Sequence, residues 1–419
     1  MTPPRSTAAA LTGYQRLIIA LLAFLQFTII LDFMVLAPLG AIIMPALKVP
    51  PAGFGALVSV YAFSAGAAGL LAAGFSDRFD RKKLLLFFYL GFIVGTLLCA
   101  LADSYRFLLI ARIVTGLFGG VIGSIVFAIT TDLFDYQLRG RVMGVVQAAF
   151  AASNVLGLPI GLYLANRWNW HAPFYLIVIT STAVGVLIVL TVRPINAHLL
   201  NKPDKSPLHH FLHTISTPRY LQGFLATVLL ATGGFMLLPF SSAYTVNNLG
   251  INVGRLPLIY MVTGIFAMVF GPLIGRLSDA IGKFKVFALG CAATIIMVLI
   301  YTNLGVTPLQ LVMLVNVLLF IGVSSRMISA SALISAVPSP ADRGSYMSIS
   351  SSLQQISGGI AAAVAGMIVK QAPDGVLQHI DILGYVLVAT TLLTLIMMYY
   401  INRMVEASAG LLSVASSGD

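Results

Sequence analysis

Long apolar runs recur along the whole chain, and polar or Gly/Pro-rich stretches separate them. Each run is close to the ~20 residues that a helix needs to cross a bilayer. Segments of about ten residues with alternating hydrophobicity, which indicate a membrane β-barrel, do not occur, so helices are the expected spanning elements. The pattern predicts an all-α membrane protein with twelve transmembrane helices, at approximately residues 17–40, 52–75, 84–102, 105–131, 142–165, 172–193, 220–247, 256–276, 285–304, 307–337, 344–370 and 380–402.

Composition agrees with this pattern. Of the 419 residues, 59% are hydrophobic and only 9% are charged, whereas a soluble domain has roughly 25% charged residues. The chain lacks the polar surface that a water-soluble protein requires. Both cysteines, Cys99 and Cys291, lie within apolar runs, so no disulfide framework is expected.

The distribution of basic residues predicts the orientation in the membrane. The chain has 24 Lys and Arg against 13 Asp and Glu, a net charge of +11. With a cytoplasmic N-terminus, 17 of the basic residues fall in cytoplasmic segments and 5 in outer loops, while Arg112 and Arg326 lie within helices. The positive-inside rule then places both termini in the cytoplasm. Because topology accounts for the positive charge, no nucleic-acid partner is expected.

The longest polar interval, 194–219, divides the chain at its midpoint and contains four of the six histidines. We interpret it as a cytoplasmic linker between an N-terminal half, residues 1–193, and a C-terminal half, residues 220–419. His209, His210 and His213 could be imagined as metal ligands, but no cysteine or carboxylate cluster accompanies them. We therefore expect no metal and no cofactor.

Two landmarks repeat between the halves. Asp77, in a loop after the second run, corresponds to Asp279 after the eighth, an offset of 202 residues. The pair Arg139-Gly140 recurs as Arg343-Gly344, an offset of 204. Two landmarks at nearly the same offset indicate two pseudo-symmetric six-helix halves in parallel orientation, with a substrate path between them.

The two repeated loops resemble the G-x-L-x-D-R-x-G-R-R pattern of the major facilitator superfamily of transporters, and the resemblance covers essentially the whole chain. The residues that match the pattern are Asp77, Arg78, Arg81 and Lys82 in the first loop and Gly275, Leu277, Asp279, Gly282 and Lys283 in the second. The departures are Ala73, Phe75 and Asp80 in the first loop and Ala280 and Phe284 in the second.

The resemblance implies a charge cluster that latches the two halves on the cytoplasmic side. The residues expected in this gate are Asp77, Arg78, Arg81, Asp132, Arg139, Asp279, Lys283 and Arg343. A carboxylate near a helix N-terminus gains about 0.3–1 kcal/mol from the helix dipole. The alternative is that these are only positive-inside loop charges, although a plain topology signal would not need the aspartates. On the first reading, Asp77→Asn should weaken cytoplasmic closure.

Asp32 is the one acidic residue that lies deep within an apolar run. An ionisable group there costs about 2.5–3.5 kcal/mol on insertion scales, which marks it as functional. At 1.5 Å per residue, Asp32 is ~22 Å from the cytoplasmic start of the first helix, and Arg112 is ~10 Å from the outer start of the fourth. The two charges therefore lie at similar depth and can pair.

A carboxylate balanced between burial, which favours its neutral form, and a nearby arginine, which favours its charged form, can load and release protons. We therefore expect Asp32 and Arg112 to couple transport to protons; the alternative is a static ion pair that only holds two helices together. The sequence from Arg112 to Gly116 resembles the R-x-x-x-G pattern of proton-coupled family members.

Gly157, Pro159 and Gly161 in the fifth run resemble the antiporter pattern of the superfamily loosely, as in sugar and drug exporters. A helix of this composition should bend and pack tightly against its partner in the other half. Arg326, in the tenth run, has no evident acidic partner; it either snorkels toward the cytoplasm or meets an anionic group of the substrate, and we expect the former.

Polar and aromatic residues within the apolar runs are candidates for the substrate cavity, namely Gln26, Tyr61, Gln147, Asn154, Tyr244, Asn316, Gln354 and Gln355. This mostly neutral set favours a neutral, cationic or amphipathic organic substrate. Each residue could instead form an interhelical hydrogen bond.

Together these features predict a secondary active transporter, a proton-coupled antiporter that exports small organic or drug-like molecules by alternating access. The alternative is a facilitator, a symporter or a lipid or amphiphile transporter of the same fold. An intramembrane enzyme would need an acid/base or metal constellation in the runs, and none is evident. We expect a monomer in a cell membrane, with small molecules, protons and lipid as its partners. Short outer loops and the absence of an Asn-x-Ser/Thr sequon indicate a bacterial inner membrane.

Overall fold

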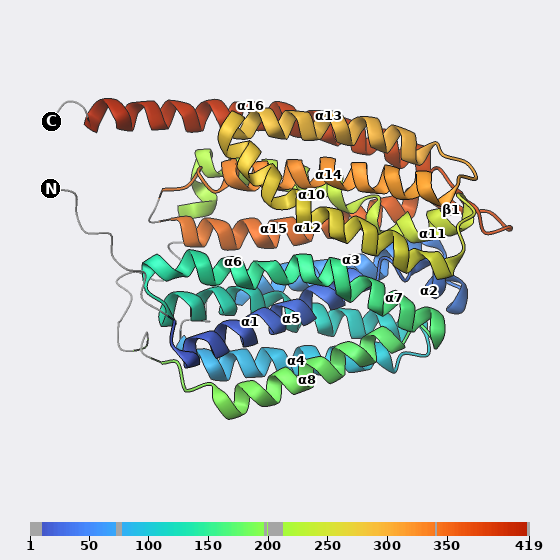
Figure 1. The fold of residues 1–419 in the computed structure, drawn as a ribbon, viewed down its shortest axis with the longest axis horizontal. Helices are drawn as coiled ribbons and strands as arrows, with labels where there is room; N and C mark the ends of the chain where they lie inside the picture. Colours follow the sequence, from blue (N-terminus) through green and yellow to red (C-terminus); the bar gives the residue numbers. More distant parts are fainter. Residues whose placement is uncertain (1–10, 73–77, 197–198, 200–212, 340–341, 417–419) are drawn as a thin grey trace.

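The computed structural model describes residues 11–72, 78–196, 199, 213–339 and 342–416, and these form an elongated bundle of helices (Figure 1). The N-terminal half consists of α1 (Gly13–Val35), α2 (Gly40–Ala46), α3 (Pro51–Ala72), α4 (Arg81–Ala100), α5 (Tyr105–Leu133), α6 (Tyr136–Ala152), the π-helical segment η2 (Ser153–Gly157), α7 (Leu158–Arg167) and α8 (Ala172–Thr191). The C-terminal half consists of α10 (Pro218–Phe235), η4 (Leu238–Phe240), α11 (Ser241–Asn247), η5 (Val253–Arg255), α12 (Leu256–Ile281), α13 (Lys283–Thr302), α14 (Leu309–Ile334), α15 (Arg343–Ile368) and α16 (Ile380–Ser416).

The bundle has two distinct ends (Figure 1). At one end α1 begins and α16 ends, and we name it the terminal face. At the other end a short antiparallel hairpin, β1 (Lys370–Gln371) and β2 (Leu377–Gln378), connects α15 to α16. We name this end the hairpin face.

Eleven helical segments of the described residues are long and apolar enough to cross a membrane. The remaining predicted span, α15, has 26 residues and is therefore long enough, but it is rich in serine and glutamine. It packs against α3 and α10, so it does not need a fully apolar surface toward lipid. The prediction of an all-helical membrane protein is confirmed, and each of the twelve predicted runs contains a helix among the described residues.

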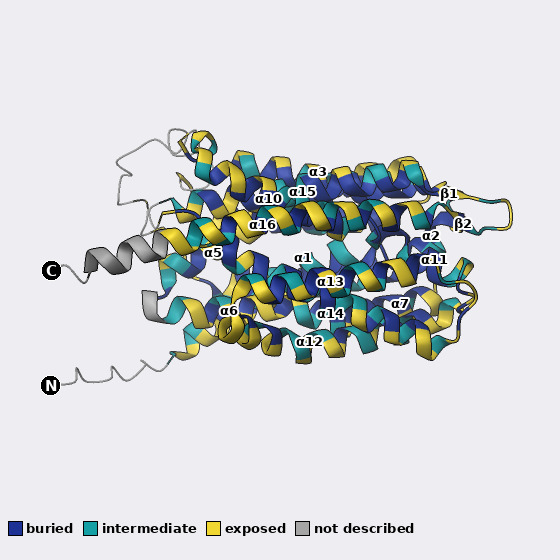
Figure 2. Cartoon of the chain, turned by 90° about the horizontal axis from the view of Figure 1, so that it is seen from above, coloured by how far each residue is buried: buried dark blue, intermediate teal, exposed yellow. Residues whose placement is uncertain are grey.

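The outer surface of the bundle is suited to lipid. Large apolar side chains such as Leu90, Ile110, Leu190 and Ile396 are exposed. Figure 2 shows exposed residues along α12 and α16 on the outside of the bundle. An apolar surface this extensive would be unstable in water and indicates a bilayer environment.

The two halves meet through α3 and α15, through α7 and η2 against α12, and through α2 against α11. At the hairpin face they are also joined by hydrogen bonds. Ser242 Oγ donates to the Ala37 carbonyl at 3.0 Å and accepts from the Ala41 amide at 3.3 Å, and Asn166 Nδ2 donates to the Val253 carbonyl at 3.2 Å. The hairpin face is therefore closed by direct contacts between the halves.

Glycines allow α3 and α5 to approach each other closely. A Cβ atom on Gly116 would lie 2.5 Å from the carbonyl oxygen of Tyr61, and one on Gly120 would lie 2.4 Å from Cα and the carbonyl oxygen of Ala65. No side chain fits at these distances, so the backbones touch. This contact fixes Tyr61 of α3 beside α5.

We therefore expect Gly120→Ala to lower the melting temperature of the purified protein, because the new methyl group forces α3 and α5 apart, and overpacking costs about 1–3 kcal/mol. Gly123→Ala is the matched control in the same helix, since nothing lies within 4 Å of its Cβ position. Equal melting temperatures for the two variants would show that this contact does not stabilise the bundle.

Candidate functional site

The centre of the N-terminal half contains a buried ion pair. Arg112 Nη1 of α5 donates to Asp32 Oδ2 of α1 at 2.8 Å, and it also lies 3.4 Å from the Asp32 carbonyl oxygen. The side chains are 1% and 0% exposed, respectively. The pairing expected from their similar depth is therefore present in the structure.

Two further helices complete the surroundings of the pair. From α4, Thr96 Oγ1 donates to the second carboxylate oxygen of Asp32 at 3.3 Å. From α3, the ring of Tyr61 lies 4.3 Å from Arg112 Cζ, a cation–π contact. Arg112 Nε is buried without a hydrogen-bond partner. Four helices thus converge on one pair of charges, and Arg112 depends on Asp32 for its main neutralising contact.

A chain of aromatic rings connects this pair to the other half. The ring centroid of Phe33, next to Asp32 in α1, lies 5.2 Å from that of Tyr61 and 5.9 Å from that of Phe235 in α10. Phe235 packs on Gly358 of α15, where a Cβ would lie 2.9 Å from its ring. A movement of α1 at Asp32 would therefore change the packing of Phe33 against α10 in the C-terminal half.

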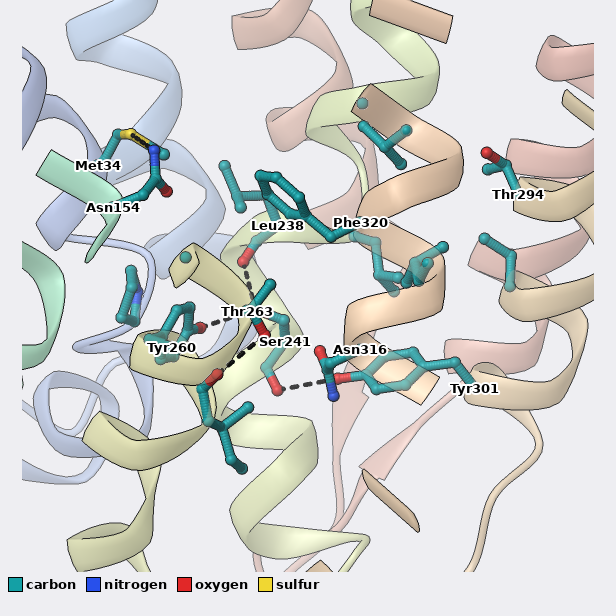
Figure 3. A pocket seen from close by; sticks show the side chains of 18 of the residues that line it. Met34, Asn154, Leu238, Ser241, Tyr260, Thr263, Thr294, Tyr301, Asn316 and Phe320 are labelled. Carbon is teal, nitrogen blue, oxygen red and sulfur yellow. Dashed lines mark hydrogen bonds between the residues drawn. The ribbon is translucent and has the colours of Figure 1, made fainter. Parts of the chain in front are cut away.

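A cavity of ≈ 180 Å³ lies between the halves. Its wall consists mainly of residues of the C-terminal half, from α10, η4, α11, α12, α13, α14 and α16, while Met34, Pro38, Asn154 and Leu158 belong to the N-terminal half. Figure 3 shows Tyr260, Ser241 and Tyr301 close together on one side of it.

The polar side chains of the cavity have hydrogen-bond partners within the protein. Tyr260 Oη lies 3.3 Å from Ser241 Oγ, and Tyr301 Oη donates to the Ser241 carbonyl at 3.2 Å. Asn316 Nδ2 donates to its own helix at Val312, and Asn154 Nδ2 to Phe150. Thr263 and Thr294 donate to carbonyls of their own helices, and most of the remaining wall is aliphatic or aromatic. A cavity of this size and chemistry is suited to a small organic molecule with an apolar body.

Asn154 and Asn316 are the two predicted cavity residues that line this cavity. Tyr61 faces Arg112, and Tyr244 donates to the carbonyls of Tyr301 and Leu304, which ties α11 to the end of α13.

The four predicted glutamines lie outside the wall of the cavity. Gln147 is exposed, whereas Gln26, Gln354 and Gln355 are half-buried. Sequence reasoning missed Ser241, Tyr260 and Tyr301, because their convergence depends on the break between α10 and α11. Pro239 within that break was the available signal.

The expected gate residues lie at the terminal face, except Asp77, which is outside the described residues. Arg81 Nε donates to Asp132 Oδ2 at 3.0 Å, which joins the start of α4 to the end of α5. Arg139 donates to the carbonyls of Phe134 and Thr131 and so caps the C-terminus of α5. The other expected members, Arg78, Asp279, Lys283 and Arg343, are exposed.

The fifth predicted helix packs closely against α12 of the other half, as expected, but its glycines do not make that contact. A Cβ on Gly157 would lie 2.7 Å from Leu31, and one on Gly161 would lie 3.1 Å from Val35, so both glycines face α1 in the same half. The close approach to the other half is made instead by Gly264 of α12, whose Cβ would lie 2.9 Å from the Asn154 carbonyl oxygen.

The helix is also irregular at this point. Pro159 has no N–H to donate to the carbonyl of Val155 four residues earlier. Residues Ser153–Gly157 accordingly form a π-helical turn, in which the Leu158 amide donates to Ser153. The turn sets the orientation in which Asn154 meets the cavity and α12.

Removing one member of the buried pair should destabilise the protein strongly. Asp32→Asn leaves Arg112 buried without an anion, and we expect a loss of about 3–5 kcal/mol in the free energy of unfolding. The double variant Asp32→Asn/Arg112→Gln should lose less than the sum of the two single variants, because it leaves no unpaired charge. Denaturation of purified protein in mixed detergent micelles measures this, and strictly additive losses would contradict it.

Comparison with known proteins supplies the family. The Major Facilitator Superfamily profile matches residues 22–362, with a second match over 223–415. The uncharacterized MFS-type transporter YceJ of Bacillus subtilis is 30% identical over 271 residues, which cover 63% of this chain and 67% of that protein. A probable sugar efflux transporter of Mannheimia succiniciproducens is 22% identical over 56% of this chain and 58% of its own length.

A shorter match, 37% identical over 24% of this chain and 20% of the relative, is to multidrug resistance protein 3 of Bacillus subtilis. Among solved structures, a bacterial homolog of the human lysosomal transporter Spinster, in an inward-facing and unoccupied conformation, has a TM-score of 0.70 at 16% identity. The similarity covers 94% of this chain and 97% of that one. The chain therefore belongs to the Major Facilitator Superfamily and is a multi-pass membrane transporter, not an enzyme.

Proposed function

We propose that this protein is a proton-coupled antiporter that exports small organic molecules by alternating access. The observation that carries the proposal is the buried Asp32–Arg112 pair and its aromatic connection, through Tyr61 and Phe33, to Phe235 in the other half. The matches to a sugar efflux transporter and a multidrug resistance protein support export.

Proton coupling follows from the charges of Asp32 and Arg112. A proton that reaches the Asp32 carboxylate converts it to the neutral acid and removes the anion that faces Arg112. The guanidinium then keeps the Tyr61 ring but is otherwise uncompensated in a medium of low polarity, where an unpaired charge is strongly unfavourable. Relief comes from a rearrangement of α1 against α5, and Phe33 transmits this movement to α10. Release of the proton restores the pair.

The closed hairpin face favours access to the cavity from the terminal face. Gln147 lies seven residues, two helical turns, before Asn154 and so on a similar face of the chain, and it is exposed. We assign the terminal face to the cytoplasm of a bacterial inner membrane, in line with the positive-inside distribution. The Arg81–Asp132 pair, together with Asp279 and Lys283, would contribute to closure of this face when the protein opens outward.

Transport in proteoliposomes with an imposed pH gradient tests the proposal. A panel of sugars, amphipathic amines and amphipathic carboxylates is offered, and we expect at least one compound to accumulate on the more acidic side, because an antiporter moves its substrate against the proton flow. Asp32→Asn should abolish accumulation. Asp103→Asn, which removes an exposed carboxylate, is the matched control and should transport normally.

Accumulation on the alkaline side would instead identify a symporter, and mere equalisation of concentration would identify a facilitator. Protein-free liposomes correct for the passive distribution of weak acids and bases. If Asp32→Asn is folded and still accumulates substrate at the normal rate, the role of Asp32 in coupling is wrong and the pair is a static tie between α1 and α5.

Cysteine labelling tests the direction of access. A cysteine at Gln147 should react with a membrane-impermeant maleimide added from the terminal face. A cysteine at Ala362, which is fully buried against Gly55, should not react from either side. The two native cysteines, Cys99 and Cys291, are buried and serve as the unlabelled background. Failure of the cysteine at position 147 to react would show that the terminal face is closed.

A further inference from the structure

Arg326 is a second buried cation, and it lies in the C-terminal half. Its side chain belongs to α14 and the residue is 2% exposed. Nε and Nη2 are buried without a hydrogen-bond partner, and its neighbour in polar contact is the thiol of Cys291. No acidic group of the described residues pairs with it. Arg112 has Asp32, whereas Arg326 has no counterpart.

The burial of Arg326 contradicts the expectation that its side chain snorkels to the cytoplasmic surface. Arg326 lies eight residues before the end of α14 at Ile334, which is ~12 Å from the terminal-face end of the helix at 1.5 Å per residue. Because side chains tilt toward the N-terminus of their own helix, Arg326 leans away from that end and toward the middle of the bundle. The guanidinium therefore remains within the protein interior.

The guanidinium lies directly behind the wall of the cavity, next to Gly233. A Cβ on Gly233 would be 3.3 Å from Arg326 Nη2 and 3.5 Å from Thr390 Oγ1, and Gly233 itself lines the cavity. Val323, one turn before Arg326, lines it as well. Because Gly233 has no side chain, a residue of the cavity wall lies directly against Nη2, a donor that has no hydrogen-bond partner.

A buried guanidinium without an anion is unfavourable unless a ligand supplies one. We propose that Arg326 binds the anionic group of the transported molecule, and that the substrate class is an amphipathic organic monoanion such as an aromatic carboxylate. The Nε and Nη2 donors are in the positions that a carboxylate can accept from together. The apolar and aromatic wall, which includes Leu319, Phe320 and Val298, would hold the apolar body.

This inference rests on the proposed function in one respect, namely that the cavity between the halves is the substrate site. It does not depend on proton coupling. Binding measured without a pH gradient can therefore test it separately, so that a protein that fails to transport against protons can still confirm the anion site, and the reverse.

The test uses 2-naphthoate as the probe and 2-naphthamide as its neutral analogue, with the full chain in detergent or nanodiscs. We expect 2-naphthoate to bind and to raise the melting temperature of the natural protein, because a ligand that binds only the folded state stabilises it. The neutral amide should bind much more weakly. Arg326→Gln should lower the affinity for naphthoate by roughly tenfold to a hundredfold, the range for a lost hydrogen bond to a charged group.

Three further variants serve as controls for this binding experiment. Arg326→Lys keeps the charge and should retain part of the affinity, whereas Gly233→Ala keeps the arginine but places a methyl group before it and should weaken binding. Arg106→Gln removes an exposed arginine at the start of α5 and should change nothing. Without ligand, Arg326→Gln should melt no lower than the natural protein, since it removes an unpaired buried charge.

Equal binding of naphthoate by the natural protein and by folded Arg326→Gln would overturn the proposal. So would equal affinity for naphthoate and naphthamide. If chloride alone stabilises the natural protein as much as naphthoate does, and naphthoate does not compete with it, Arg326 holds an inorganic ion and the assignment to an organic substrate is wrong.

Discussion

The organisation of this transporter depends on the Asp32–Arg112 ion pair. Both charges are fully removed from solvent, where each alone would be strongly unfavourable, so each constrains the position of the helix that carries the other. Thr96 and Tyr61 add contacts from α4 and α3, and the glycines of α5 allow the close approach that these contacts require. The N-terminal half is thus assembled around a charge pair whose energy changes with a single proton.

The two halves use their buried charge differently. The arginine of the N-terminal half is neutralised internally, whereas Arg326 of the C-terminal half has no anion among the described residues. The cavity lies mainly in the half with the unpaired cation. On the proposed function, this asymmetry divides the roles, with proton handling in one half and substrate recognition in the other. The Phe33–Phe235 contact provides the physical connection between them.

Much of this could be predicted from the chain alone. Apolar runs of bilayer length determine the helices, since a lipid environment leaves the backbone no other way to satisfy its hydrogen bonds. The depth of Asp32 and Arg112 along their helices was enough to predict their pairing. Individual contacts could not be predicted in this way: Gly157 and Gly161 face α1 in the same half, although their helix packs on α12 as expected, and Arg326 is buried in the interior.

The sequence by itself determined the class of protein, the number of helices and the rarity of intramembrane charge, because these depend on composition and on spacing along one helix. Only the tertiary structure decided which residues line the cavity. Ser241, Tyr260 and Tyr301 come from three elements and converge after α10 breaks before α11. Such convergence depends on the rotation and crossing of packed helices, and a small residue such as Gly264 determines how closely two of those helices approach.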